Sequence, residues 1–373
     1  MKEFLLIDHE PWSVRRKELF YNLFKAAGVK LQVLDLSSWL YPELTISDEI
    51  KDAPYLTKIN SEKELYDFLS SKNPYNTIIV LEVIKNWKNR KIFKIISDLN
   101  FKSIKIELFG NTSITQSLKE KLTQLKFSSI YSIIKRKIES IHLNLYDKLH
   151  HIKSYSEVLS SNAISYRTTP FNHPDYERFK FVETKQIISV DYIVFCDIFF
   201  PSHPDFKYFY KVKKLPDSSK YQSIMKDFFD YLESKYKIPV VIAAHPKSDY
   251  RGNEFGDRQI IKYQTDNLIA NAKMVTLHKC NSISYALLHD KPIAFIGTDD
   301  YLNLDFVRRT FPNIANKTLG LQIYNLNKTD FSDITFEKVS EPLRLTYIFN
   351  YLTSDKTQNI PNAETLRQLI AKI

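Results

Sequence analysis

Short, almost continuous runs of apolar residues alternate along this chain with longer segments of helical pattern, and this alternation restricts the folds open to it. The clearest runs are Thr77–Val83, Asp191–Phe195, Val240–Ala244 and Pro292–Ile296. Continuous apolar runs of this length are typical of parallel strands that are covered by helices on both faces. Parallel strands that alternate with helices predict an α/β fold.

The first part of the chain predicts one doubly wound domain. Strands are expected at 3–8, 30–36, 77–83 and 103–109, and helices at 14–27, 61–71, 90–99 and 114–125. A longer helix over 128–151 combines an apolar stripe with a basic cluster. Such a helix could lie on an anionic membrane surface, but we favour the interpretation that its apolar face packs on its own domain.

Residues 152–188 show no clear periodicity, and we predict the connection between two domains here. A second series of strands and helices then begins at Asp191, with helices expected at 218–236 and 342–352. The sequence thus predicts an N-terminal Rossmann-like domain over 1–165, a C-terminal Rossmann-like domain over 185–340, and C-terminal helices over 341–373 that could cross back to the first domain.

Composition narrows the class of protein. The chain has 373 residues, of which 43% are hydrophobic and 26% charged, which is typical of a globular protein with two cores. The first residues suggest a strand and not a signal peptide, and only two cysteines occur, so a cytoplasmic location is expected. The net charge of +10 favours an anionic partner, or simply reflects a lysine-rich solvated surface.

Several common site motifs are missing. The sequence holds no GxGxxG, no GxxxxGK[ST] and no GxSxG, so a dinucleotide fingerprint, a P-loop and a hydrolase elbow are not predicted. No Cys or His spacing suits a metal, and no nucleic-acid module can be recognised. We therefore predict no metal, no cofactor and no nucleic-acid partner.

Polar residues follow two of the apolar runs. His245, Pro246 and Lys247 come directly after the run 240–244, and Asn281, Ser282 and Ser284 open a predicted helix over 282–289. A histidine and a lysine beyond a strand, together with hydroxyls and free N–H groups at a helix start, can bind a phosphate. Ser282 could instead be a plain N-cap and His245 an ordinary loop residue. Because both motifs follow predicted strands in the same part of the chain, we favour the phosphate site over these simpler interpretations.

This pair of motifs resembles the His-Pro and Ser motifs of bacterial sialyltransferases and polysialyltransferases, and of related Kdo transferases of surface-polysaccharide synthesis. The resemblance covers mainly residues 190–300. It implies the GT-B fold, with two Rossmann-like domains facing a cleft, an acceptor domain first and a donor domain second. It also implies that His245, Pro246, Ser282 and Ser284 hold the phosphate and ribose of a CMP-activated sugar acid, with Lys247 and Asn281 beside them.

The reaction implied by this resemblance needs a carboxylate. Asp197 follows an apolar strand, and it could be a general base or a nucleophile. His203 and Asp205 are weaker candidates, because a His-Pro-Asp sequence is also typical of a plain turn. The acidic motif that supplies the base in sialyltransferases is not found in the first domain. Asp8 and Glu10, after the first strand, are its only substitutes, and we take Glu10 as the second catalytic candidate. Whether the reaction inverts or retains the sugar configuration stays open.

The predicted function is transfer of Kdo or a sialic-acid-like nonulosonate from its CMP derivative, a substrate and not a cofactor, to a glycan or lipid-linked glycan of capsule or lipopolysaccharide. Peripheral attachment to the inner membrane is left open. Two alternatives remain, a GT-B transferase that uses a UDP- or GDP-sugar, and a non-catalytic nucleotide-binding protein of polysaccharide assembly.

Overall fold

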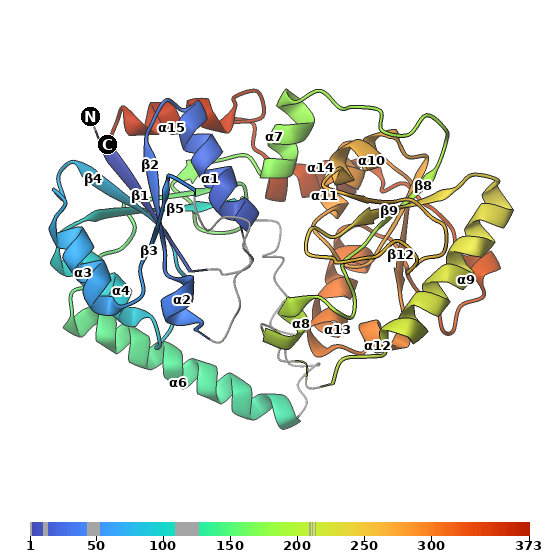
Figure 1. Cartoon of the computed structure of the whole chain (residues 1–373), viewed down its shortest axis with the longest axis horizontal. Helices are drawn as coiled ribbons and strands as arrows, with labels where there is room; N and C mark the ends of the chain where they lie inside the picture. The colour runs from blue at the N-terminus through green and yellow to red at the C-terminus, as the bar shows by residue number, and fades with distance from the viewer. Residues whose placement is uncertain are drawn as a thin grey trace. The chain divides into compact units, whose positions relative to one another are not determined.

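The computed structural model describes residues 2–9, 14–42, 53–108, 127–208, 210, 212 and 214–373. These residues form two compact units (Figure 1). The first unit contains the described residues up to Leu108, those from Phe127 to Asn172, and the last segment, Ser354–Ile373. The second unit contains the described residues of His173–Thr353.

The first unit is built around a parallel sheet in the order β3-β2-β1-β4-β5-β6-β7. Its strands are β1 (Glu3–Asp8), β2 (Leu31–Asp35), β3 (Leu56–Lys58), β4 (Thr77–Glu82), β5 (Lys102–Glu107), β6 (Glu157–Ser160) and β7 (Thr169–Pro170). Its helices are α1 (Val14–Ala26), α2 (Ser37–Leu40), α3 (Glu62–Ser70), α4 (Arg90–Asp98), α6 (Phe127–Leu149) and α15 (Asn362–Ile370). The central strand β1 is apolar and fully buried from Phe4 to Ile7, because helices cover the sheet on both faces.

The second unit repeats this plan with a parallel sheet in the order β10-β9-β8-β11-β12-β13. Its strands are β8 (Ile193–Cys196), β9 (Val240–Ala244), β10 (Ile260–Lys262), β11 (Met274–Leu277), β12 (Ile293–Gly297) and β13 (Ile323–Asn325). Its α-helices are α7 (Pro174–Phe181), α8 (Pro204–Tyr208), α9 (Ser218–Tyr236), α10 (Thr265–Asn271), α11 (Ile283–Leu288), α12 (Asp299–Leu302), α13 (Asp305–Pro312) and α14 (Glu341–Tyr347). One continuous core joins the sheet to these helices.

Both sheets have the doubly wound order in which the first strand lies inside and the chain then winds outward in two directions. The predicted α/β class with two Rossmann-like domains is confirmed. The predicted crossing back is confirmed for the last helix only. Helix α14 stays in the second unit, whereas α15 packs on α1, where Arg367 donates to the Ala26 carbonyl at 3.0 Å.

The sequence prediction differs from the structure in several elements. Residues 152–188, predicted as a connection, contain β6, β7 and α7. Strand β6 has only two apolar residues, Val158 and Leu159, which is too short a pattern to show a period. The predicted helix over 342–352 is α-helical only to Tyr347 and π-helical from there to Leu352. The predicted helix over 114–125 lies outside the described residues.

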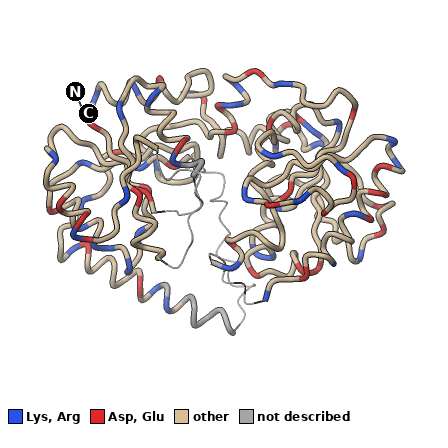
Figure 2. The backbone as a smooth tube through the Cα atoms, in the orientation of Figure 1, with Lys and Arg blue, Asp and Glu red and all other residues tan. Residues whose placement is uncertain are grey.

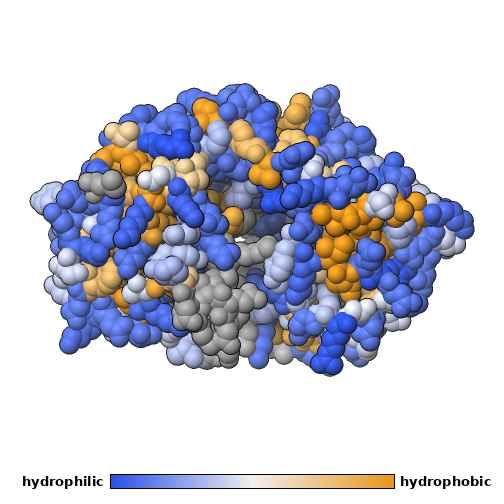
Figure 3. Space-filling view, turned by 45° about the horizontal axis from the view of Figure 1, so that its top comes forward, coloured by the Kyte–Doolittle hydropathy of each residue, from blue (hydrophilic) through white to orange (hydrophobic). Residues whose placement is uncertain are grey.

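Charged residues of both signs are interspersed over the two units (Figure 2). On the face drawn in Figure 3, hydrophilic residues predominate and hydrophobic ones gather in separate patches. Among the helices that the structure describes, none combines the length and the apolar character that crossing a membrane would require.

Candidate functional site

The predicted donor-binding residues lie at the carboxyl edge of the second sheet. Strands β9, β8 and β11 are neighbours in that order and all run parallel. The winding direction changes between β8 and β11, and ligands of open α/β sheets bind at the carboxyl edge beside such a change. The loops that follow these three strands therefore form the candidate site.

The loop after β9 begins with a tight turn that orients His245. The Ser248 N–H donates to the His245 carbonyl at 2.9 Å, and Pro246 occupies the first central position of this turn, where its fixed φ is favourable. The Lys247 N–H donates to Nδ1 of His245 at 3.1 Å. The local sequence thus fixes both the backbone and the imidazole.

The loop after β8 contains a second turn of the same kind. The Phe206 N–H donates to the His203 carbonyl at 3.1 Å, and the Asp205 N–H donates to His203 Nδ1 at 3.0 Å. The rings of His203 and His245 lie edge to face, with centroids 4.5 Å apart. The structure therefore adds His203, a weak candidate from the sequence, to the predicted His245.

These contacts define the protonation state of both histidines. Burial lowers the pKa of His203 and of His245 to about 3, so both rings are neutral near pH 7. Each Nδ1 accepts a backbone N–H, so the proton of each ring is on Nε2. The 3.6 Å approach of His203 Nδ1 to the Asp205 carboxylate is therefore not an ion pair. The site presents two neutral N–H donors.

Cationic side chains lie around this histidine pair. The ammonium of Lys247 is 3.5 Å from the Asp205 carboxylate. Lys262 at the end of β10 donates to the Ser248 carbonyl and lowers the pKa of His245 further through its charge. Lys262 carried no signal in the sequence, because it reaches this loop only through the pairing of β10 with β9.

Asp197 connects the loops after β8 and β9. Its Oδ1 accepts the Phe199 N–H at 2.9 Å, and its Oδ2 accepts the His245 N–H at 3.3 Å and the Tyr250 hydroxyl at 3.0 Å. The side chain is buried, which raises its pKa to about 6 although the donors act in the opposite direction. Asp197 accepts three hydrogen bonds from the protein itself. These contacts are those of a residue that holds other residues of the site in position. Tyr250 is a further residue that the sequence analysis missed.

Phe199 shows what this positioning achieves. Its φ of 54° lies in the left-handed region that non-glycine residues avoid. The bond from its N–H to Asp197 and the bond from the His203 N–H to its carbonyl, at 2.8 Å, hold the segment in this conformation. Asp197 thereby also fixes the position of His203.

The predicted serine motif lies after β11, which is the neighbour of β8 on the side opposite β9. Because β8 lies between β9 and β11, the two loops are separated by roughly 10 Å. Asn281 is exposed, and Ser282 is half-buried without a side-chain capping bond to helix α11. Ser284 is fully buried and hydrogen-bonds to the Asp175 carboxyl of α7. The structure therefore leaves Asn281 and Ser282, and not Ser284, accessible.

Lys279 in the same loop was also missed. Its side chain is partly buried, and this burial lowers its pKa. Among the residues that the structure describes, no carboxylate lies within ion-pair distance of its ammonium. A desolvated ammonium without a counter-charge favours an anionic ligand. The neighbouring His278 is different, because both its nitrogens are occupied, Nδ1 by the Ile296 carbonyl at 2.8 Å and Nε2 by the Tyr221 hydroxyl at 2.7 Å.

In the first unit, the corresponding change of winding direction lies between β1 and β4. Asp8 ends β1, is buried, and accepts the His9 N–H at 2.7 Å. Glu10, the second catalytic candidate, lies outside the described residues. Within the described ranges, no three metal-ligating side chains gather.

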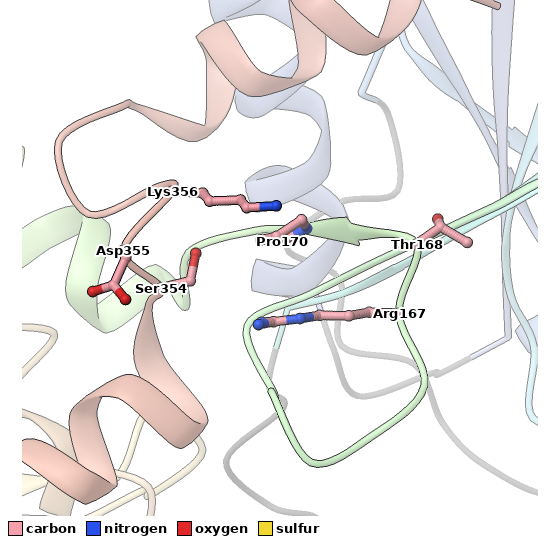
Figure 4. Close-up of a pocket in the computed structure, with 6 residues that line it drawn as sticks. All are labelled: Arg167, Thr168, Pro170, Ser354, Asp355 and Lys356. Carbon is pink, nitrogen blue, oxygen red and sulfur yellow. The ribbon is translucent and has the colours of Figure 1, made fainter.

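A cavity of 410 Å³ in the first unit lies apart from all predicted site residues. It is lined by Arg167, Thr168, Pro170, Ser354, Asp355 and Lys356 (Figure 4). Arg167 uses Nη1 to donate to the Ser160 and Ser161 carbonyls, both at 3.2 Å. The Asp355 carboxylate points away from the cationic ends of Arg167 and Lys356 (Figure 4). The hydrogen bonds of Arg167 therefore hold neighbouring backbone of its own unit in place.

No protein-family model matches this chain, and no curated protein matches it in sequence. Solved structures resemble it over its whole length. The UDP-GlcNAc 2-epimerase of Methanocaldococcus jannaschii has 11% identity and a TM-score of 0.46, covering 100% of this chain and 99% of that chain. MurG of Acinetobacter baumannii has 8% identity and a TM-score of 0.46, covering 100% of both chains. MnaA of S. aureus, solved with UDP, has 10% identity and a TM-score of 0.49, covering 100% of this chain and 98% of that chain.

Proposed function

We propose that this chain is a glycosyltransferase that binds a nucleotide-activated sugar at the carboxyl edge of its second sheet. The pair His203 and His245 is the observation that carries this proposal. Two neutral imidazoles lie 4.5 Å apart, and each offers an Nε2–H that no described residue accepts. Lys247 and Lys279 add positive charge at the same edge. This combination of fixed donors and cations suits a phosphate.

The donor that we propose is a CMP-activated sugar acid, Kdo or a sialic-acid-like nonulosonate, as the His-Pro and Ser motifs imply. When its glycosidic bond breaks, the departing CMP gains negative charge on the phosphate. Fixed N–H donors and a nearby ammonium would stabilise this charge in the transition state. The loop with Asn281 and Ser282, roughly 10 Å away, would contact another part of the nucleotide.

The acceptor would be a hydroxyl of a surface glycan or lipid-linked glycan. The contacts of Asp197 favour a role in holding the two histidine loops, so we propose that the base comes from the first unit, with Glu10 as the candidate. In the sequence Glu10 follows the end of β1 at Asp8 by two positions, which supports this assignment.

Binding of CMP should stabilise the protein selectively. At a CMP concentration about 100 times its Kd, the gain is about 2.7 kcal/mol, which corresponds to a Tm increase of roughly 5–10 °C for a unit of this size. A thermal-shift series with CMP, UMP, GMP and UDP measures this effect. A shift with UDP or GDP alone would exclude the CMP donor, and no shift with any nucleotide would contradict the site. Release of CMP from a CMP-sugar in the presence of a glycan acceptor distinguishes an enzyme from a nucleotide-binding protein.

Replacing His245 with Asn should preserve the turn and weaken ligand binding. The Asn side-chain oxygen can accept the Lys247 N–H in place of Nδ1, whereas the Nε2–H donor is lost. We expect an unchanged Tm without ligand and a Kd for the nucleotide that rises on the order of tenfold or more, because a hydrogen bond to a charged group is lost. Isothermal titration measures it, with His142→Asn, an exposed histidine of the first unit, as control. Equal affinity of His245→Asn and wild type would refute the assignment.

A further inference from the structure

Helix α6 carries an exposed apolar stripe. Ile134, Ile138, Ile141, Leu145 and Leu149 are 51%, 48%, 57%, 51% and 75% exposed. Their spacings of four, three, four and four residues place them on one face of the helix. Over these 16 residues the stripe is roughly 22 Å long. An exposed apolar surface of this regularity indicates an interaction surface.

The opposite face of α6 attaches the helix to the first unit, and it does so mainly through polar contacts. The Trp87 N–H donates to the Glu139 carboxylate at 3.2 Å, and Lys85 forms an ion pair with Asp147 at 2.6 Å. The Trp87 ring also contacts the Tyr146 ring, with centroids 6.1 Å apart. The expectation that the apolar face of this helix packs on its own domain is therefore wrong. A hydrophobic pattern in the sequence shows that the two faces of a helix differ in polarity, but it does not show which face is buried.

The charges around the stripe determine what can cover it. Lys135, Lys137 and Lys148 are exposed, whereas the acidic residues Glu139 and Asp147 are used in the contacts with the first unit. The outward side of the described helix thus combines apolar side chains with positive charge only. A second copy of α6 would bring like charges together, which is unfavourable. An anionic lipid surface complements both the stripe and the lysines.

We propose that α6 binds the protein to an anionic membrane surface, lying in the plane of the interface. The five apolar side chains would enter the boundary between headgroups and acyl chains, and the three lysines would contact anionic headgroups. This proposal rests on α6 alone and is independent of the nucleotide site in the second unit.

Co-sedimentation with lipid vesicles tests this proposal. Wild-type protein should bind vesicles of 30% phosphatidylglycerol in phosphatidylcholine and bind pure phosphatidylcholine at least tenfold more weakly, because each lysine contributes roughly a fivefold factor in affinity. The variant Ile138→Gln/Leu145→Gln should lose at least tenfold in affinity for the anionic vesicles. Glutamine preserves the helix propensity, and both side chains are exposed, so folding should not change.

Two further variants make the result specific. Lys135→Glu/Lys148→Glu should weaken binding to the anionic vesicles alone. Ile187→Gln/Val190→Gln, which removes exposed apolar residues of the second unit, should bind as wild type does. The proposal fails if wild-type protein does not bind anionic vesicles, or if the α6 variants bind as tightly as wild type. It also fails if sedimentation velocity shows a dimer that Ile138→Gln/Leu145→Gln converts to monomer without any effect on lipid binding.

Discussion

The substitution Asp197→Ala is expected to destabilise the second unit by about 3 kcal/mol or more and to abolish nucleotide binding. It leaves the Phe199 N–H, the His245 N–H and the Tyr250 hydroxyl without their acceptor. A buried donor without a partner costs about 1–3 kcal/mol. The left-handed conformation of Phe199 also loses the bond that holds it. Urea unfolding and titration with CMP measure the two effects.

The variant Tyr250→Phe is the matched control, because it removes one donor and keeps the carboxylate. We expect it to lose about 1 kcal/mol of stability and to retain CMP binding. A different outcome for Asp197→Ala would assign the carboxylate another role. If Asp197→Ala is as stable as wild type and binds CMP but has no turnover, the carboxylate acts directly on the substrate, as a general base or nucleophile would.

The second unit should lose stability as the pH falls from 6.5 toward 4. Burial lowers the pKa of all five of its histidines, to about 3 for His173, His203 and His245, to about 4 for His278, and below the usual value for His289. Below pH 6.5 the unfolded chain protonates these rings and the folded unit does not. Stability then falls by up to about 1.4 kcal/mol per histidine for each pH unit.

Two carboxyl groups act in the opposite direction. Burial raises the pKa of Asp197 to about 6 and that of Asp175 to about 7, so between pH 4 and these values the folded unit binds protons that the unfolded chain does not. The four histidines whose pKa lies at about 4 or below, set against the two carboxyl groups, leave a net loss on the order of 3 kcal/mol per pH unit near pH 5. Urea unfolding at pH 4.5, 5.5, 6.5 and 7.5 measures this slope.

His173→Asn provides the control for this pH dependence. Nδ1 of His173 accepts the Asp175 N–H at the start of α7, and asparagine is a favourable residue for this capping position. The variant should fold and lose about 1.4 kcal/mol per pH unit of the slope. A stability of the wild-type unit that does not change between pH 4.5 and 6.5 would contradict the buried neutral state of these histidines.

The sequence predicts well those elements whose pattern is set by burial. The strand at 240–244 and the helix at 218–236 agree with β9 and α9 to the residue. Strand β9 is buried on both faces, so all its residues are apolar, and α9 is capped by Asp217, which accepts the Ser219 N–H. Strands β6 and β13 were not predicted, because each contains only two adjacent apolar residues and so shows no apolar run.

The candidate site was predictable only where its geometry is local. The turn that fixes His245 is encoded by Pro246 and the residues next to it. In contrast, the pairing of His203 with His245 and the three donors on Asp197 arise when β8 and β9 become neighbours. The burial of Ser284 against α7 likewise depends on a segment more than 100 residues away, which no local motif shows.

The return of α15 to the first unit has a consequence for how the protein is made. Residues of the second unit follow one another along the chain from His173 to Thr353, and they can fold once that stretch has left the ribosome. At that stage the first unit cannot yet be complete. The contact of Arg367 with Ala26 joins residues 341 positions apart, so it forms only after the end of the second unit has been made. The N-terminal unit is therefore completed last, and a chain that stops short of Asn362 leaves α1 without the helix that covers it.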